Sequence, residues 1–339
     1  MKVLVTGSAG FIGGYLIQEL LAQGHSVIGI DNYSKYGQVT KSYDNDKNYQ
    51  FVQGDVKDTE LLTHLLEECD YFIALAAKIG GISYFHTYAY DLLAENERIT
   101  ASSFDAAIEA FKNKKLKKIV VISSSMVFES TDIYPTPESA ILTTPPPKST
   151  YGFQKLACEY FAKGAWEQYK LPYTIIRPFN CVGVGESRAK GGKEIKSGNV
   201  SLAMSHAVPD IVQKVLKGQN PLHILGKGNQ VRCYTYGGDI AKGIVTATFS
   251  PKAQNEDFNI STDQATTVLE LSKLIWKKIN GDKPFKYVSD KPFEYDVQKR
   301  IPDTTKAKKI LKYKAETSLD SMLDEIIPWI ESQMKQGLI

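Results

Sequence analysis

The stretch Lys2-Val-Leu-Val-Thr6-Gly7-Ser-Ala-Gly10-Phe-Ile-Gly13 decides the fold. Its first five residues are mostly apolar and are typical of a short buried strand. Three glycines then follow at a spacing of three, and the pattern from Tyr15 to Gln23 predicts an amphipathic helix. A glycine-rich turn between a strand and a helix lets backbone N–H groups and the helix N-terminus approach a phosphate closely. The stretch therefore predicts a strand, turn and helix that bind a pyrophosphate.

An acidic residue follows at the end of the next predicted strand. That strand runs from Ser26 to Ile30, and Asp31 comes eighteen residues after Gly13. A carboxylate at this place can accept hydrogen bonds from an adenosine ribose, and it repels a 2′-phosphate. The sequence therefore favours NAD over NADP as the cofactor.

Two later strand ends extend the predicted cofactor site. Gly54-Asp55-Val56 follows a third strand, where Asp55 is expected to meet the adenine amino group. Ala74-Leu-Ala-Ala77 ends a fourth strand with small residues that let a dinucleotide lie against the backbone. The residues expected to contact the cofactor in this half of the chain are Gly7, Gly10, Phe11, Ile12, Gly13, Asp31, Asn32, Asp55, Val56, Leu75, Ala76 and Ala77.

Short apolar runs alternate with helical patterns through the first half of the chain. This order predicts right-handed crossover units and a parallel sheet covered by helices on both faces, which is a doubly wound α/β fold. The expected segments are the strands Val3 to Thr6, Ser26 to Ile30, Tyr71 to Leu75, Ile119 to Ser123 and Tyr173 to Arg177, and the helices Tyr15 to Gln23, Leu61 to Glu68 and Leu92 to Phe111.

The second half of the chain is less regular. Residues 183 to 200 are rich in glycine and charge and predict a long loop. After it we expect the helices Pro209 to Leu216, Val268 to Ile279 and Leu319 to Met334, and the strands His223 to Leu225 and Phe258 to Ile260. These elements predict a smaller C-terminal α+β domain that packs over the carboxyl ends of the sheet strands, where ligands of such folds bind. We assign residues 1–180 and about 234–262 to the NAD-binding domain, and 181–233 and 263–339 to the substrate domain.

Tyr151-Gly-Phe-Gln-Lys155 carries the predicted chemistry. On a helix, residues four apart project from the same face, so Lys155 can place an ammonium beside the phenol of Tyr151. A nearby positive charge lowers the pKa of a phenol from about 10. The motif therefore predicts that Tyr151 is an acid or base near neutral pH.

The composition excludes several other classes of protein. The chain has 339 residues, a formal charge of +3 and 42% hydrophobic residues, which is typical of a soluble enzyme and gives no electrostatic reason to expect nucleic acid as a partner. The four cysteines show no paired spacing, so we expect no metal site and no disulfide framework. No apolar stretch is long enough for a membrane span, and the N-terminus has no signal-peptide pattern. A cytoplasmic protein is expected.

Taken together, these motifs resemble the extended short-chain dehydrogenase/reductase family, and within it the NAD-dependent nucleotide-sugar epimerases and dehydratases. The resemblance implies a Rossmann fold and a nucleoside-diphosphate-sugar substrate. It covers almost the whole chain and rests on Gly7-x-x-Gly10-x-x-Gly13, Asp31, Gly54-Asp55, Leu75-Ala-Ala77, Ser123-Ser-Ser125, Tyr151-x-x-x-Lys155, Arg177-Pro-Phe-Asn180, Gly226-Lys-Gly-Asn-Gln-Val-Arg232, Asp239 and Arg300-x-x-Asp303.

The resemblance also implies roles for single residues. Tyr151 would be the base, Lys155 would hold the nicotinamide ribose, and Ser124 would bond to the reacting sugar hydroxyl, because it lies four residues before Phe128 of the family's Val-Tyr motif. Ser125 is the alternative to Ser124. Further cofactor contacts are expected from Asn96 and Pro178. The expected substrate contacts are Lys78, Gly81, Ser124, Met126, Asn180, His206, Arg232 and Arg300.

Two segments are similar to GDP-fucose synthase and GDP-mannose 3,5-epimerase. Ala76-Ala-Lys-Ile-Gly-Gly81 is similar to both, and Ser205-His206-Ala-Val-Pro209 is similar to a motif of the former in which the histidine donates a proton. His206 is therefore either a second acid or a phosphate ligand. Those enzymes carry a cysteine where this chain has Met126, and the 4,6-dehydratases and glucuronate decarboxylases carry a glutamate there.

With Met126 in place of a second acid or base, the resemblance implies reversible hydride transfer at C4, and a 4-epimerase is the expected enzyme. The alternatives are a 4,6-dehydratase, a C4 oxidase or a 3,5-epimerase of a GDP-sugar, with Glu129, Asp132 or Glu138 as substitute acids. A non-catalytic NAD-binding scaffold is a further alternative. The resemblance also implies a homodimer formed by the helices Leu92 to Phe111 and Tyr151 to Tyr169.

Overall fold

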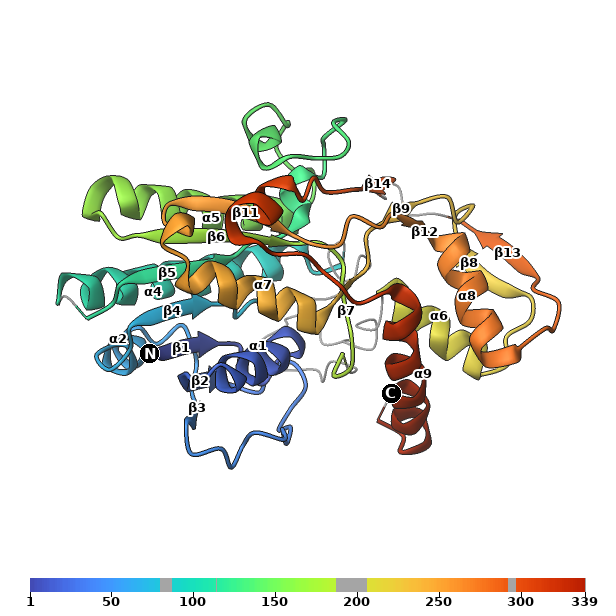
Figure 1. The fold of residues 1–339 in the computed structure, drawn as a ribbon, viewed down its shortest axis with the longest axis horizontal. Helices are drawn as coiled ribbons and strands as arrows, with labels where there is room; N and C mark the ends of the chain where they lie inside the picture. The colour runs from blue at the N-terminus through green and yellow to red at the C-terminus, as the bar shows by residue number, and fades with distance from the viewer. Residues whose placement is uncertain (80–86, 114, 187–205, 292–296, 339) are drawn as a thin grey trace.

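The computed structural model describes residues 1–79, 87–113, 115–186, 206–291 and 297–338. A seven-stranded sheet lies at one end of the molecule and a smaller group of helices and short strands at the other (Figure 1). The strand order is β11-β6-β5-β4-β1-β2-β3, and every neighbouring pair is parallel. The predicted doubly wound fold is thus confirmed. The strands are β1 (Lys2–Thr6), β2 (Ser26–Asp31), β3 (Tyr49–Gln53), β4 (Tyr71–Ala74), β5 (Lys118–Ile122), β6 (Tyr173–Pro178) and β11 (Glu256–Ile260).

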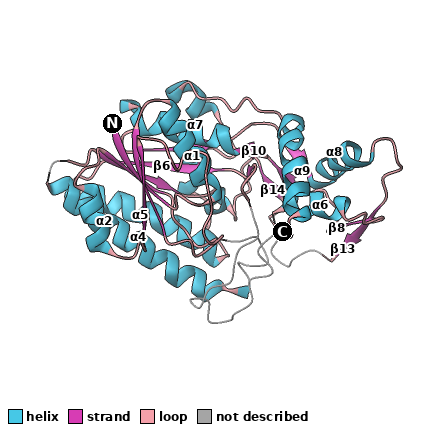
Figure 2. Cartoon of the chain, turned by 90° about the horizontal axis from the view of Figure 1, so that it is seen from below, coloured by secondary structure: helices cyan, strands magenta, loops and turns pink. Residues whose placement is uncertain are grey.

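Helices cover both faces of the sheet (Figure 2). Successive residues of a strand point to opposite faces, so Val3 and Val5 pack with α1 and α7, whereas Leu4 packs with α2, α4 and α5. Because both faces are buried, the inner strands β1, β4 and β5 are mostly apolar, whereas the edge strands β3 and β11 carry polar residues. The helices are α1 (Phe11–Ala22), α2 (Thr59–Leu66), α4 (Ala89–Lys112), α5 (Thr150–Tyr169) and α7 (Gly237–Phe249).

Helix α7 is not among the predicted helices. Glycines at positions 237, 238 and 243 lower its helix propensity, which hides it in a local pattern. A Cβ at Gly237 would lie 2.6 Å from the ring of Tyr15 in α1, so the missing side chain lets the two helices approach each other closely. The chain then enters β11, at the sheet edge beside β6.

The C-terminal elements form a second hydrophobic core. Three helices, α6 (Ala207–Leu216), α8 (Val268–Asn280) and α9 (Leu319–Lys335), pack with the parallel pair β8 (Leu222–Leu225) and β13 (Tyr287–Asp290). No described helix is long and apolar enough to cross a membrane. The remaining short elements are β7 (Cys181–Val182), β9 (Val231–Arg232), β10 (Thr235–Tyr236), β12 (Thr266–Thr267), β14 (Lys299–Arg300), 3₁₀ turns at Ser125–Phe128, Glu138–Leu142 and Pro251–Ala253, and a π-helical turn at Ala307–Leu311.

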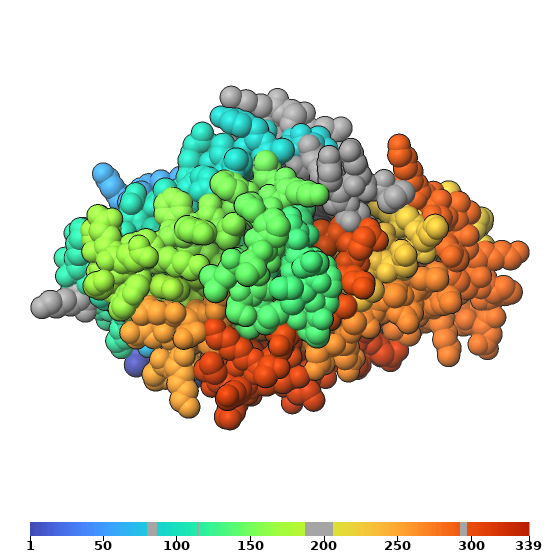
Figure 3. All heavy atoms as spheres, turned by 90° about the horizontal axis from the view of Figure 1, so that it is seen from above, coloured from blue at the N-terminus to red at the C-terminus, as the bar shows by residue number. Residues whose placement is uncertain are grey.

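A late segment of the chain returns to the sheet domain. The N–H of Thr136 donates to the carbonyl of Ile301, and the N–H of Asp303 donates to the carbonyl of Thr136, both at 2.8 Å. Figure 3 shows the segment in green that carries Thr136 packed against the late segment in red. This return places Arg300 next to the carboxyl ends of the strands.

Candidate functional site

A cavity of about 460 Å³ lies at the carboxyl ends of the sheet strands, between the sheet and the C-terminal elements. It is large enough for much of a dinucleotide and a sugar, and it is the place where folds of this type bind ligands. The predicted site residues that line it are Gly7, Gly10, Phe11, Ile12, Gly13, Asp31, Asn32, Asp55, Val56, Leu75, Ala76, Ala77, Lys78, Ser124, Ser125, Met126, Tyr151, Lys155, Pro178, Asn180, His206, Arg232 and Arg300.

The glycine turn is built for a close backbone approach. Gly7 has a φ of +72°, and a Cβ there would lie 3.0 Å from Cα of Ala76. A Cβ at Gly13 would lie 2.3 Å from the carbonyl oxygen of Gly7, so only glycine allows α1 to start directly above the turn. Helix α1 begins after Gly10, which has no side chain to accept from the first N–H groups of the helix. These N–H groups lie at the end of α1 that lines the cavity. These residues fit the pyrophosphate of a dinucleotide.

Asp31 is held in a fixed orientation at the end of β2. Its Oδ2 accepts from the N–H of Ala9 at 3.1 Å, and its Oδ1 accepts from the N–H of Tyr33 at 2.7 Å. Burial raises the pKa of this carboxyl, and the two N–H donors and Lys41 act in the opposite direction. A fixed carboxylate at this strand end suits the hydroxyls of an adenosine ribose.

Asp55, which is expected to meet the adenine, lines the cavity after β3. Its Oδ1 accepts from the N–H of Lys57 at 2.9 Å, and its Oδ2 accepts from the amide of Asn32 at 3.3 Å. Lys57 also forms ion pairs with Asp55 and Glu95. These contacts fix Asp55 at the cavity wall.

Asn96 lies in α4 and has a different position from the one expected. Its Oδ1 accepts from the N–H of Lys78 at 2.7 Å, and its Nδ2 donates to the carbonyl of Lys78 at 2.9 Å. It is buried and is not among the described residues that line the cavity. Asn96 therefore holds the backbone of Lys78, which itself faces the cavity. The predicted substrate residue Gly81 lies outside the described residues.

The local structure after β5 brings Ser124 to Tyr151. Ser124 caps the 3₁₀ turn Ser125–Phe128, and its Oγ accepts from the N–H of Met126 at 3.2 Å. Helix α5 starts beside this turn, where a Cβ at Gly152 would lie 2.9 Å from the carbonyl oxygen of Met126. The hydroxyl of Ser124 bonds to Tyr151 and lowers its pKa. Of the two serines considered for the reaction, the structure brings Ser124 to the phenol, and Ser125 is buried beside it.

The prediction that Lys155 sets the pKa of Tyr151 is wrong for the chain by itself. Burial raises the pKa of Tyr151 to about 12, and Ser124 and Arg300 act in the lowering direction. The ammonium of Lys155 donates instead to the carbonyl of Ile122 at 2.8 Å, and burial lowers its pKa. The sequence pattern placed Tyr151 and Lys155 on one helix face, but it could not show that packing buries the phenol and excludes water from it.

Two arginines from neighbouring strands line the substrate side. Arg232 of β9 and Arg300 of β14 are register partners in a parallel pair. Nη1 of Arg232 donates to the carbonyl of Val231 at 2.9 Å. Asn180 lines the same side with a φ of +40°, and its amide donates to the carbonyl of Cys233 at 3.4 Å. Two adjacent guanidinium groups suit a diphosphate, because each presents several N–H donors.

His206 begins helix α6 at the cavity edge. Its Nδ1 pairs with the carboxylate of Glu186, which also lines the cavity. Met126 is buried and packs with Tyr88, Leu92 and Tyr151. The wall next to the phenol is therefore apolar at this position.

Many lining residues carry no motif and were not predicted. Glu186 could have been suspected from its charge in a glycine-rich loop, whereas the apolar residues of α6 and β8 have no local signal. The unpredicted members of the lining include Ser34, Lys35, Tyr36, Lys57, Ile79, Glu95, Cys181, Val182, Glu186, Val208, Pro209, Ile211, Lys214, His223, Leu225, Gln230, Tyr234 and Val268.

Comparisons with known proteins agree with this geometry. Residues 3–261 match the model of the NAD dependent epimerase/dehydratase family. The chain belongs to this family. An uncharacterized UDP-glucose epimerase of Bacillus subtilis, YtcB, is 29% identical, with 98% of each chain covered. The UDP-glucose 4-epimerase of Thermotoga maritima, solved with UDP-glucose, is 28% identical with a TM-score of 0.80, and 98% of this chain and 100% of that chain are covered.

A third relative is the UDP-glucuronic acid 4-epimerase from Bacillus cereus, solved with UDP-glucuronic acid and NAD. It is 27% identical with a TM-score of 0.81, over 98% of this chain and 99% of that chain. Membership of the NAD-dependent epimerase/dehydratase family confirms that the chain is an enzyme and that its cofactor is NAD. The finer likeness to GDP-fucose synthase and GDP-mannose 3,5-epimerase stays a prediction.

Proposed function

We propose that this member of the family is a nucleoside-diphosphate-sugar 4-epimerase. One observation carries the proposal: Tyr151 and Ser124 lie together in the cavity, and the position beside them is the apolar Met126. A thioether cannot take a proton from carbon, so this place offers no second base for C3 or C5. The remaining chemistry is proton transfer at the C4 hydroxyl coupled to oxidation at C4.

In the proposed reaction the residues of the chain hold the substrate and move one proton. Arg232 and Arg300 bind the diphosphate, and Ser124 bonds to the C4 hydroxyl. Tyr151 takes the hydroxyl proton and later returns it, as a positioned acid and base does. The chemistry that bound NAD would supply is reversible hydride transfer at C4, to either face of the sugar carbon. Gly7, Gly10, Gly13, Asp31 and Lys155 would hold the cofactor.

The pKa of Tyr151 makes the surrounding charges part of this proposal. A phenol with a pKa of about 12 is protonated at neutral pH, and each nearby positive charge that lowers the pKa increases the phenolate fraction that can accept the hydroxyl proton. Arg300 already acts in this direction. Lys155 lies one helical turn from Tyr151 on the same side of α5, but its ammonium donates to the carbonyl of Ile122, so Arg300 is the positive group that acts on the phenol.

A second candidate is a dehydratase or a 3,5-epimerase, which needs another acid. His206 favours it, because the imidazole lines the cavity and pairs with the carboxylate of Glu186. Imidazole is a common general acid and base in catalysis.

We further propose a homodimer formed through α4 and α5, and residence in the cytoplasm. The two helices pack together, and α5 exposes large aromatic side chains, with exposed fractions of 48% for Phe153 and 65% for Tyr160. Exposed aromatic side chains gathered on one helix mark an interaction surface.

We also propose the two-domain division at 1–180 with 234–262 and 181–233 with 263–339, supported by the separate core of α6, α8 and α9.

A panel of UDP-, GDP-, CDP- and dTDP-sugars tests the proposal. The purified enzyme should convert one of them to its C4 epimer, identified by NMR of the product, with no net change in mass. Loss of water or of carbon dioxide, or conversion of none of the sugars, would contradict it.

A further inference from the structure

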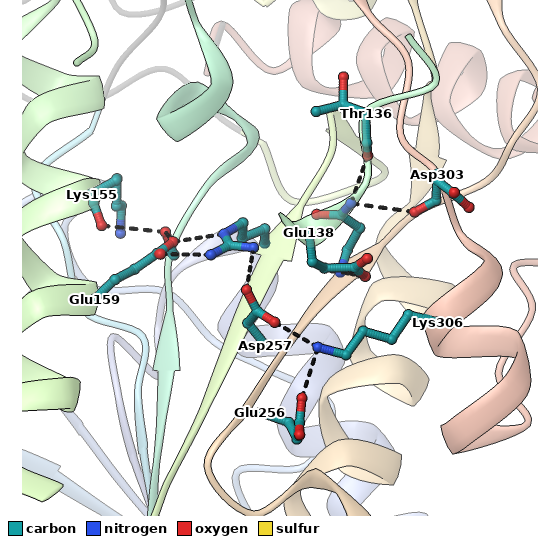
Figure 4. Close-up of polar contacts among 11 residues, drawn as sticks. Thr136, Glu138, Lys155, Glu159, Glu256, Asp257, Asp303 and Lys306 are labelled. Carbon is teal, nitrogen blue, oxygen red and sulfur yellow. Dashed lines mark hydrogen bonds and ion pairs between the residues drawn. The ribbon is translucent and has the colours of Figure 1, made fainter. Parts of the chain in front are cut away.

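A chain of buried charged groups starts behind the catalytic lysine and runs across the sheet (Figure 4). The hydroxyl of Ser123 donates to Oε1 of Glu159 at 2.6 Å. Nε and Nη2 of Arg177 donate to the two oxygens of Glu159 at 2.8 and 2.7 Å. The side chains of Glu159 and Arg177 are both 0% exposed. This two-pronged bond therefore lies wholly inside the protein, between α5 and β6.

The chain of charges continues from Arg177 to the surface. Nη1 of Arg177 pairs with Oδ2 of Asp257 in β11 at 2.8 Å. Asp257 pairs with Lys306 at 2.6 Å, and Lys306 pairs with Glu256 at 2.8 Å. Negative and positive charges thus alternate from Glu159 to Glu256, where the outermost carboxylate is partly exposed.

The inner end of this chain of charged groups contacts the backbone of Lys155. The hydroxyl of Ser123 lies 3.3 Å from the carbonyl oxygen of Lys155, and the ammonium of Lys155 donates to the carbonyl of Ile122 at 2.8 Å. Two successive residues at the end of β5 therefore hold both the backbone and the side chain of Lys155. Glu159 lies one helical turn beyond Lys155 on the same face of α5.

Fold stability alone is a weak explanation for this arrangement. Apolar side chains of similar size often replace a buried ion pair without loss of stability. The ammonium of Lys155 is buried, however, and a buried cation needs an opposite charge close to it. On its own helix Lys155 has Tyr151 one turn before it and Cys158 and Glu159 after it. Glu97 from α4 and Arg177 from β6 act on Cys158, and Asp257 from β11 acts on Arg177.

Of these groups, Glu159 is the carboxylate that acts directly on Lys155. Burial lowers the pKa of the lysine, and Cys158 and Glu159 raise it. Burial raises the pKa of the Cys158 thiol to about 12, so the thiol is neutral near pH 7 and leaves the compensation to Glu159. Arg177 in turn holds Glu159 in place, because it donates to both carboxylate oxygens.

We propose that Glu159 is a positioning residue for the reaction: held by Arg177 and Ser123, its carboxylate balances the charge of the buried Lys155 ammonium, which donates to the carbonyl of Ile122. This proposal rests on the proposed function, because that function gives Lys155 its role in holding the cofactor. Asp257 adds a second negative charge beside Arg177, and Lys306 pairs with Asp257. These two residues connect the site to β11 and to the segment next to the π-helical turn.

The variant Glu159→Gln tests the charge directly. It keeps the shape of the side chain and removes the negative charge. The measurement is trace acetylation of the NAD-containing enzyme across pH 6 to 11, with the label on the Lys155 peptide quantified by mass spectrometry. We expect the midpoint for Lys155 to fall by about one pH unit or more, the usual effect of losing a close opposite charge. The alkaline limb of kcat/KM should move down with it.

The matched control is Glu256→Gln, which removes a carboxylate from the outer end of the same chain. It should leave both the labelling midpoint of Lys155 and the pH profile unchanged. A folded Glu159→Gln enzyme with the wild-type midpoint would overturn the proposal and leave Glu159 with a structural role only. Because labelling needs no turnover, this result stands even if the enzyme proves not to be an epimerase.

Ser123→Ala keeps the proposal testable if Glu159→Gln does not fold. It removes the hydroxyl that joins Glu159 to the Lys155 backbone and retains every charge. We expect kcat to fall about tenfold, the scale of one lost hydrogen bond to a charged group, with KM and the labelling midpoint unchanged. A wild-type kcat in this variant would contradict the positioning role.

Discussion

Arg232 and Arg300 are direct register partners in the parallel pair of β9 and β14, although they lie 68 positions apart in the sequence. Both side chains line the cavity, and Arg300 also lowers the pKa of Tyr151. In the proposed function both arginines bind the diphosphate, but they differ in their effect on the phenol.

This difference gives a prediction for two matched variants. Arg232→Met should raise KM by about 10- to 100-fold, the cost of one lost charge-assisted contact, with kcat nearly unchanged. Arg300→Met should raise KM similarly and also lower kcat, because the pKa of Tyr151 rises when the positive charge is removed. Steady-state kinetics of the two variants decide the matter. Equal effects on kcat would show that Arg300 does not act on the phenol.

Tyr151→Phe should lower kcat by at least about 10²-fold, the usual contribution of a positioned proton-transfer group. The phenyl ring keeps the packing against Met126 and Leu92, so the binding of NAD and of nucleotide sugar should be nearly unchanged. Calorimetric titration and turnover of the same preparation give both numbers. Normal turnover would mean that Tyr151 is structural.

Asp31→Ala should weaken NAD binding by about 10- to 100-fold, because it removes the acceptor for the ribose hydroxyls. The side-chain contacts to the N–H groups of Ala9 and Tyr33 are lost as well, so Asp31→Asn is the control that keeps the shape of the side chain. NAD that is retained after purification can be quantified in an acid extract. Equal NAD content in the wild type and both variants would contradict the placement of the ribose.

The buried Lys118 predicts a pH effect on stability. Its ammonium donates to the carbonyl of Ala247, and burial lowers its pKa from 10.5 to about 8. Between pH 8 and 10.5 the unfolded chain therefore binds more protons at this residue than the folded chain, so its contribution to stability rises with pH. The melting temperature of the wild type minus that of Lys118→Met should increase from pH 7.5 to pH 10. A constant difference would mean that the buried amine has an ordinary pKa.

The sheet could be predicted because its signals are local. The turn from Gly7 to Gly13 and the strand ends at Asp31 and Ala77 each have a pattern of a few residues, and parallel topology then brings them to one edge. Helix α7 could not be predicted, because its glycines are explained by distant residues: Gly237 meets the ring of Tyr15, and Gly243 meets Ile260 and Tyr313.

The finer chemistry depended on tertiary contacts that no spacing shows. The sequence placed Tyr151 and Lys155 on one helix face, but burial of the phenol and the bond from Lys155 to Ile122 come from packing against β5. Asn96 matched a motif, yet its amide bonds to the backbone of Lys78. The individual role of each site residue stays a prediction until the variants are measured.

The most direct test of the epimerase proposal is turnover in D₂O. If Tyr151 moves only the proton of the C4 hydroxyl, the hydrogen bound to C4 leaves and returns as hydride. It therefore does not exchange with solvent. Mass spectrometry of the product, after exchangeable hydroxyl deuterons are washed out, should therefore show no deuterium on carbon. A gain of one mass unit at carbon would mean that His206 or a carboxylate near Glu129 performs a second proton transfer, and it would contradict the 4-epimerase proposal.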